Sequence, residues 1–242
     1  MDHPPLPLPP LPYALAAYDD RAALARALAA HVAQALLSRT ARDGAASLAV
    51  SGGRTPALFL ETLSAAPLDW GRITVTLVDE RWVPETSVRS NAALVRAHLL
   101  KGEARRARFV PLFTGAPTPE VGLDEATARA AGLPRPFAAV VLGMGDDGHT
   151  ASFFPGAAGL DAAIDPAAPA ALAAIRAAAA GEPRITFTLP PLLAADTLLL
   201  HIEGKVKREV LGAASRPGPD GEMPIRAVLR HARRPLDVLW CP

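Results

Sequence analysis

Short apolar runs that end in glycine or in charged residues alternate along this chain with segments of helical periodicity. The clearest run extends from Phe137 to Leu142, and the glycine-rich segment 143–149 follows it directly. Buried parallel strands are continuous apolar runs of this length, and they commonly lead into such turns. Strands that alternate with helices predict an α/β fold with one doubly wound, mostly parallel sheet.

The periodicity and the flanking residues place the other elements. Leu24, Leu28, Val32 and Leu36 recur every four residues, which predicts a helix over 20–41 that ends at Gly44. We expect further helices at 57–64, 90–100, 118–131, 192–195 and 205–214. We expect strands at 46–50, 73–78, 108–113, 137–142, 171–176, 184–189, 197–202 and 236–240. Loops are predicted at 157–169 and 217–224, and no linker divides residues 13–242, which follow a proline-rich leader at 1–12.

Composition narrows the class of protein. Half of the 242 residues are hydrophobic, 20% are charged and the net charge is +1, which argues against disorder and against a nucleic-acid-binding surface. Cys241 is the sole cysteine, so an internal disulfide and a cysteine-based zinc site are excluded. No apolar run has the length of a membrane span or the pattern of a signal peptide. We therefore expect a cytoplasmic protein with no membrane partner, as a monomer or weak homodimer.

One histidine stands out by its neighbours. His149 alone lies among carboxylates and glycines, and Gly145 lets the backbone approach a ligand closely. We predict that His149 is a catalytic base whose ring is held by Asp146 or Asp147. The alternative is a tight turn in which Asp147 caps a short helix at Gly148 and the histidine is merely solvated.

A second glycine turn joins the strand at 46–50 to the helix at 57–64. Its glycines, Gly52 and Gly53, expose consecutive backbone N–H groups, and Pro56 suits a first helical turn. The positive end of the helix dipole therefore offers an anion site, to which the side chains of Ser51, Arg54 and Thr55 add donors. The segment is neither a Walker A loop nor a dinucleotide-binding loop. A strand-to-helix turn with nothing bound is the alternative.

Charge also follows the strand at 73–78. Asp79 and Arg81 are two residues apart, so in an extended chain they project to one side. Together they can hold a sugar hydroxyl and a developing oxyanion. They can equally form a surface salt bridge, which is usually worth less than about 1 kcal/mol.

Six segments stand in the order and spacing of one enzyme family. They are the Ser51–Pro56 loop, Asp79 to Pro84 (DERWVP), Ser90-Asn91, Gly143 to Pro155, Arg184 to Thr186, and Gly204-x-x-Lys207. From about residue 48 onward the chain resembles the 6-phosphogluconolactonases, which share a Rossmann-like fold with sugar-phosphate isomerases. The commoner family form has serine in place of Arg54, which leaves the backbone cradle intact.

The resemblance implies hydrolysis of 6-phosphoglucono-δ-lactone, a sugar phosphate lactone, in the oxidative pentose phosphate pathway, with no metal and no organic cofactor. It places the phosphate in the Ser51–Thr55 loop, clamped by Arg184 and Lys207. In that chemistry His149 activates water, Asp147 or Asp146 stabilises the imidazolium, and Arg81 faces the carbonyl oxygen. The alternative, which the residues alone would favour, is that Arg184 caps a strand edge and that Lys207 is one solvated charge among several.

Two rival functions use the same fold. Glucosamine-6-phosphate deaminases share the serine-glycine loop and the histidine block, but their pattern has an acid directly before the proline, where this chain has Phe154. A non-catalytic sugar-phosphate sensor of a transcription regulator normally carries a helix-turn-helix, for which the first 45 residues offer a single amphipathic helix. The lactonase interpretation is therefore favoured.

Overall fold

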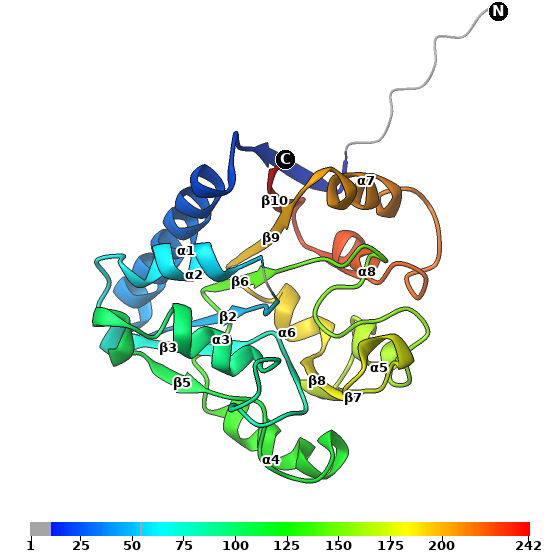
Figure 1. The fold of residues 1–242 in the computed structure, drawn as a ribbon, viewed down its shortest axis with the longest axis horizontal. Helices are drawn as coiled ribbons and strands as arrows, with labels where there is room; N and C mark the ends of the chain where they lie inside the picture. Colours follow the sequence, from blue (N-terminus) through cyan, green and yellow to red (C-terminus); the bar gives the residue numbers. More distant parts are fainter. Residues whose placement is uncertain (1–10, 54) are drawn as a thin grey trace, which may run out of the picture.

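The main sheet has seven parallel strands in the order β1-β10-β9-β6-β2-β3-β5 (Figure 1). The structure, a computed structural model, describes residues 11–53 and 55–242. The strands of this sheet are β1 Tyr13–Ala17, β2 Ala46–Val50, β3 Ile73–Leu77, β5 Arg108–Val110, β6 Ala139–Leu142, β9 Thr197–Glu203 and β10 Leu236–Cys241. The predicted doubly wound, mostly parallel α/β fold is confirmed.

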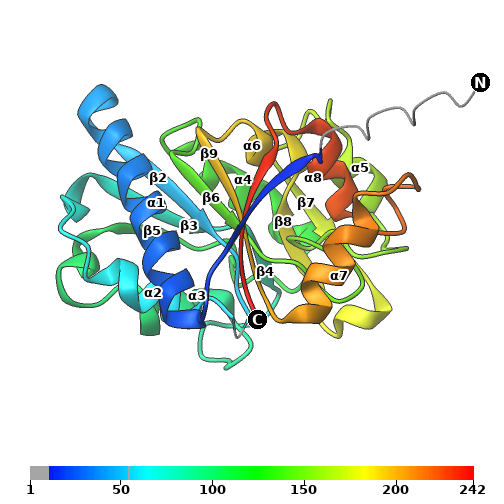
Figure 2. The same cartoon turned by 90° about the horizontal axis from the view of Figure 1, so that it is seen from above.

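Helices lie on both sides of this sheet (Figure 2). One side carries α1 Arg21–Asp43 and α2 Ala57–Ser64, with α3 Asn91–His98 packed beside α2. The other side carries α7 Lys205–Ala214 and α8 Ile225–His231, with α6 Leu189–Leu193 against α8. The remaining helices are α4 Pro119–Ala131, α5 Leu160–Ile164 and the short 3-10 turns Trp70–Arg72, Gly102–Arg106 and Ala178–Ala180.

A second, antiparallel sheet was not predicted. It consists of β4 Asp79–Arg81, β8 Arg184–Phe187 and β7 Leu172–Ile175, in that order. The chain enters it directly from β3, because only Val78 separates β3 from β4. The pairing sets Arg81 opposite Arg184. The strands at 171–176 and 184–189 were expected in the main sheet, and no strand was expected at 79–81. The backbone of β4 instead turns away from the main sheet and pairs with a segment about a hundred residues further along the chain.

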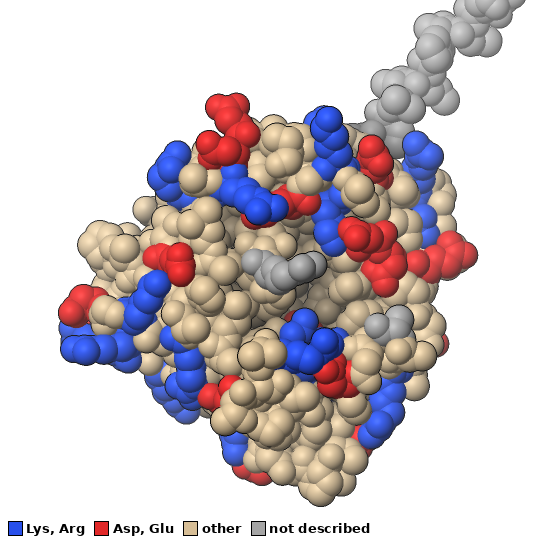
Figure 3. Space-filling model, in the orientation of Figure 1, with Lys and Arg blue, Asp and Glu red and all other residues tan. Residues whose placement is uncertain are grey.

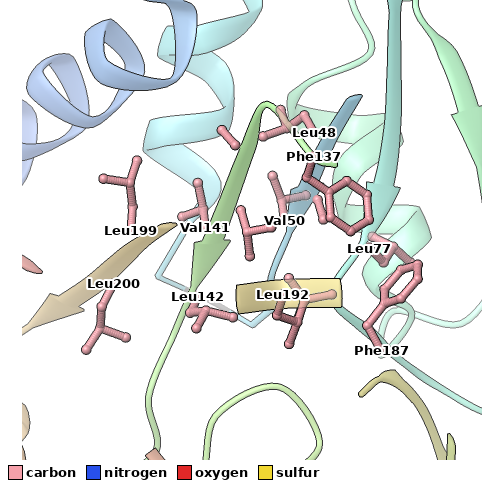
Figure 4. Packing of buried hydrophobic residues seen from close by; sticks show 14 of the residues in the cluster. Leu48, Val50, Leu77, Phe137, Val141, Leu142, Phe187, Leu192, Leu199 and Leu200 are labelled. Atoms are coloured by element: carbon pink, nitrogen blue, oxygen red, sulfur yellow. The ribbon is translucent and has the colours of Figure 1, made fainter. Parts of the chain in front are cut away.

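The core fills the space between the main sheet and its covering elements. Every residue of β2, β3 and β6 is buried, as expected of parallel strands covered on both faces. Figure 4 shows Leu48 and Val50 of β2 near Phe137, with Val141 of β6 lying between them and Leu199 of β9. Complete burial of one such side chain stabilises the fold by roughly 1.5–3 kcal/mol. The strand ends are therefore rigid supports for the loops that follow them.

Local capping explains where several helices begin and end. Asp20 accepts a hydrogen bond from the Ala23 N–H at the start of α1, at 2.7 Å. Gly44 ends α1 in the left-handed conformation, with φ of 79°, and this is the predicted end. Ser90 and Thr118 cap α3 and α4 in the same way as Asp20 caps α1.

Four further features differ from the sequence prediction. The segment 157–169 is not all loop, because α5 lies within it, and that prediction was wrong. The helix α6 begins at Leu189 and not at 192, because proline is tolerated in the first turn of a helix. The strand β1 and the helix α8 were not predicted.

The leader lies almost wholly outside the described part of the chain. Residues 1–10 and Arg54 are not described, so the predictions for them are untested by the structure. Pro12 is described, and its carbonyl accepts a hydrogen bond from the Leu236 N–H at 3.0 Å, which attaches it to the sheet edge. Across 11–53 and 55–242, no helix combines the length and the apolar character needed to cross a bilayer.

Candidate active site

The topology creates a crevice between β2 and β6. From β2 the chain passes through α2 to β3 on one side, whereas from β6 it continues to β9 on the other side. Ligands of doubly wound folds bind at this kind of switch point, outside the carboxyl ends of the strands. The Ser51–Pro56 loop follows β2 and the Gly143–Gly148 loop follows β6, so the two glycine turns meet there.

A cavity of about 390 Å³ opens at this point, within the range of small-molecule sites. Figure 3 shows the hollow near the centre of one face, with basic side chains beside it. The structure brings together most of the residues that the sequence singled out. The cavity is lined by Ser51, Gly52, Gly53, Thr55, Asp79, Arg81, Gly145, His149, Arg184 and Lys207. Asp147 stands behind His149, outside the lining.

Hydrogen bonds join the two glycine turns. The Ser51 N–H donates to the Val141 carbonyl at 3.0 Å, and the Ser51 hydroxyl accepts from the Gly143 N–H at 3.2 Å. Gly53 has a φ of 95°, which favours glycine. A Cβ on Gly52 would lie 1.8 Å from Asn91 Oδ1, so no larger residue fits there. The helix α2 begins just beyond with no side-chain cap, which leaves its first N–H groups available to an anion.

The loop after β6 forms a compact turn around His149. The Gly145 N–H donates to the His149 carbonyl at 2.8 Å, and the Gly148 N–H donates to the Gly145 carbonyl at 3.2 Å. Gly148 has a φ of 77° and its carbonyl accepts from the Ile225 N–H at 2.9 Å, which anchors the turn to α8. No helix forms at Gly148, so the alternative with a capped helix is not what the structure shows.

Asp147, and not Asp146, holds the imidazole. Asp147 Oδ1 lies 2.6 Å from His149 Nδ1 and also accepts the His149 backbone N–H at 3.1 Å. Burial raises the pKa of the Asp147 carboxyl, but these hydrogen bonds and the charge of His149 outweigh burial and leave that pKa below its ordinary value. The carboxylate therefore stays ionised beside the ring, which leaves Nε2 as the nitrogen available for proton transfer.

Phe154 packs against the ring of His149. The two ring centroids are 4.5 Å apart at 34°, and the Arg184 guanidinium lies 5.4 Å from the Phe154 centroid. A phenyl ring neither accepts nor donates a proton. Asp147 is thus the carboxylate in contact with this imidazole, and Phe154 helps to fix the position of the ring.

Asp79 is buried and does not form the surface salt bridge that was the alternative. Its Oδ2 accepts from the Ser152 hydroxyl at 2.5 Å, and only 6% of Asp79 is exposed. The guanidinium of Arg81 donates to the Arg89 carbonyl, and its Nε has no partner in the described residues. Both side chains line the cavity.

The two cations expected around a phosphate have protein partners. Arg184 donates to the Ala180 carbonyl at 2.8 Å and to the Glu182 carbonyl at 3.2 Å. Lys207 Nζ donates to the Met144 carbonyl at 2.6 Å and lies 3.0 Å from Asp146. Lys207 is therefore not a freely solvated charge, since it also ties α7 to the turn after β6.

Sequence reasoning missed several residues of this site. Glu80 is a structural residue, because its buried carboxylate accepts the N–H groups of Arg81, Asn91 and Ala92 and the Ser90 hydroxyl. Asn91, Arg89, Ser152 and the pair His201 and Glu203 were not assigned to the site, although all except Ser152 line the cavity. Of these residues, only Asn91 had a signal in the sequence, namely its position directly after Ser90, which caps α3.

Among the described residues, no group of three or more histidine, cysteine, aspartate or glutamate side chains is arranged to hold a metal ion. The cavity itself combines a histidine bonded to a carboxylate with cations and backbone N–H donors.

Comparison with known proteins agrees with this geometry. The family model described as glucosamine-6-phosphate isomerases/6-phosphogluconolactonase matches residues 19–240. The 6-phosphogluconolactonase of Rhizobium meliloti strain 1021 is 52% identical over 93% of this chain and 97% of its own, and that of Mesorhizobium japonicum is 50% identical over 93% and 94%. The crystal structure of a 6-phosphogluconolactonase from Shewanella baltica OS155 superposes with a TM-score of 0.92 at 39% identity, covering 95% of this chain and 98% of that one.

These relatives are all named 6-phosphogluconolactonases, and the matches span nearly their whole length, so they favour neither rival function. The fold, the paired glycine turns and the sequence comparisons point to the same group of enzymes. The chain therefore belongs to the glucosamine-6-phosphate isomerase/6-phosphogluconolactonase family, within its 6-phosphogluconolactonases.

Proposed function

We propose that this protein hydrolyses 6-phospho-D-glucono-1,5-lactone to 6-phospho-D-gluconate, with His149 as the base that activates water. One observation carries the proposal: an imidazole oriented by a carboxylate and a helix-terminal anion cradle line one cavity of hexose size. The lactonase relatives support the substrate.

The reaction follows from the site residues. His149 Nε2 takes a proton from water as the water oxygen bonds to C1 of the lactone, and Asp147 stabilises the resulting imidazolium. The carbonyl oxygen gains negative charge, which the Arg81 guanidinium offsets. The intermediate then collapses with cleavage of the bond from C1 to the ring oxygen, which receives the proton from His149. Asp79 holds a sugar hydroxyl or the attacking water.

The phosphate is proposed to bind at the first glycine turn. The N–H groups of Gly52, Gly53 and Thr55 and the start of α2 would face it, with Arg184 and Lys207 as its cations. The side chain of Arg54, which lies outside the described residues, belongs to the same proposed cradle. Since Lys207 is bonded to Met144 and Asp146, its ammonium would divide its donors between the phosphate and that turn.

A coupled assay with freshly prepared lactone tests the function, with spontaneous hydrolysis subtracted and glucosamine 6-phosphate as the parallel substrate. His149→Ala should lower kcat by about 10² or more, with little change in the affinity for 6-phosphogluconate. Near-normal turnover of this variant would remove His149 from the mechanism. A wild-type protein that binds 6-phosphogluconate without accelerating hydrolysis would be a sensor.

The phosphate clamp has a separate test. Arg184→Ala and Lys207→Ala should chiefly weaken reaction with the phosphorylated lactone, because they remove cations and not the base. Equal losses on unphosphorylated glucono-1,5-lactone would contradict the clamp.

We further propose that the protein acts in the cytoplasm as a monomer or weak homodimer. Its only cysteine, Cys241, is buried and unpaired. The large hydrophobic side chains that are exposed lie on separate elements, which does not favour a broad apolar interface; they are Leu11, Leu37, Leu58, Val88, Val121 and Val206. Light scattering of the full chain measures the assembly directly.

A further inference from the structure

Arg89 brings a cation to the cavity that the phosphate clamp does not include. It lies in the loop between β4 and α3, lines the cavity, and has 54% of its side chain exposed. Its guanidinium meets both carboxylate oxygens of Glu182, with Nη2 donating to Oε2 at 2.8 Å. The loop before α3 is thereby connected to the turn before β8.

Arg89 stands in a group of like charges. Burial lowers the pKa of Arg184, and the positive charges of Arg81 and Arg89 lower it further, whereas Asp79 and Glu182 oppose this effect. Asp79 is already engaged by the Ser152 hydroxyl. Glu182 is therefore the counter-ion through which Arg89 is held beside two other guanidinium groups.

We propose that Arg89 is a third cation for the 6-phosphate of the substrate and that the phosphate displaces Glu182 from it. This inference rests on the proposed function. The phosphate is the only charged group of the lactone, so it is the group that a third guanidinium recognises. A dianion with three acceptor oxygens competes well with one carboxylate for a guanidinium fork that is about half exposed.

The backbone brings Arg89 to the correct end of the cavity. Asn91, two residues along, packs its side chain against Gly52 of the phosphate cradle. The Arg89 carbonyl accepts from the guanidinium of Arg81, whose strand neighbour is Arg184. The backbone at Arg89 is thus linked to the cradle through Asn91 and to Arg184 through Arg81.

A purely structural role predicts a different outcome. If the pair with Glu182 only fastened two loops, removing either partner would loosen the site equally. If Arg89 binds phosphate and Glu182 competes for it, the two substitutions act in opposite directions.

Calorimetric titration with 6-phosphogluconate separates these roles without requiring turnover. Arg89→Gln should weaken binding about tenfold, the loss of one charge-assisted contact. Glu182→Gln should tighten binding by about threefold, the strength of an exposed ion pair. Arg96→Gln is the matched control, because Arg96 pairs with Glu85 at 2.5 Å, has 51% of its side chain exposed and lies outside the cavity lining.

Steady-state kinetics add a second measurement. In Arg89→Gln the loss should fall on KM for the phosphorylated lactone, with kcat/KM for glucono-1,5-lactone unchanged. Unchanged affinity in Arg89→Gln, or a loss in Glu182→Gln equal to that in Arg89→Gln, overturns the inference while wild-type hydrolysis stands. A wild-type protein that neither binds 6-phosphogluconate nor hydrolyses the lactone overturns the proposed function as well.

Discussion

Gly145 is the position at which one added carbon reaches the proposed base. Its φ is not positive, so the main chain accepts alanine there. A Cβ would nevertheless lie 2.0 Å from His149 Nδ1 and 2.6 Å from Asp147 Oδ1. Ordinary contact begins at 3.4 Å, so the ring must move by about 1.4 Å, the difference between 3.4 and 2.0.

Gly145→Ala should therefore reduce catalysis by displacing the imidazole. A misplacement of about 1 Å costs on the order of 10² in rate, close to the value of a positioned general base. We expect kcat to fall by about 10² while the affinity for 6-phosphogluconate changes little, since the phosphate cradle lies on the other turn. The coupled lactone assay and calorimetry measure the two quantities.

A double-mutant cycle tests the reasoning. In the His149→Ala background the ring is gone, so adding Gly145→Ala should cost almost nothing further. Gly221→Ala is the control, because a Cβ on Gly221 meets no atom within 4 Å. A full additional loss in the double variant, or normal kcat in Gly145→Ala, would refute displacement of His149 as the cause.

Two further predictions concern stability. In Glu80→Gln the NH2 group would face one of the backbone N–H groups that the carboxylate now accepts, such as that of Ala92. The free energy of unfolding should therefore fall by about 2 kcal/mol and Tm by roughly 4–8 °C. Thermal unfolding measures this, and an unchanged Tm would count against the role of Glu80. Arg176 lowers the pKa of Glu120 from 4.5 to about 2, so their pair stabilises the fold above about pH 4.5 and this contribution is lost as the pH falls toward 2. Because both side chains are half exposed, Glu120→Gln should cost at most about 0.5 kcal/mol at pH 7 and nothing near pH 2, measured by urea unfolding. An equal cost at both pH values would exclude the ion pair as its source.

Local signals in the sequence were sufficient for the units that build the site. The strand β2, its glycine turn and α2 were predicted with the bounds that the structure shows, and so was α7 after Gly204. Each depends on neighbouring residues: an apolar run, a turn with glycine, and a helical repeat. The turns at Ser51 and His149 line one cavity because parallel strands align their carboxyl ends.

Those local signals did not predict which strands pair when they lie far apart in the sequence. The small sheet joins Asp79–Arg81 to Arg184–Phe187, and three residues of β4 carry no pattern that identifies this partner. The choice between Asp146 and Asp147 was also open, because it depends on the turn geometry set by Gly148. Arg89 was missed because a loop arginine has no periodicity, and its relevance appears only where Glu182 and Arg184 approach it.

The edge strand β1 has a consequence for synthesis of the protein. Tyr13 pairs with Leu236 and Ala17 with Trp240, so this strand has no neighbour until residues 236–241 have left the ribosome. Its backbone donors and acceptors must remain hydrated, or shielded by a chaperone, until β10 has been synthesised. Pairing of β1 is thus a late step in folding. A chain truncated before Leu236 would lack β10, so β1 and β9 would both expose unpaired strand edges that can associate with other chains.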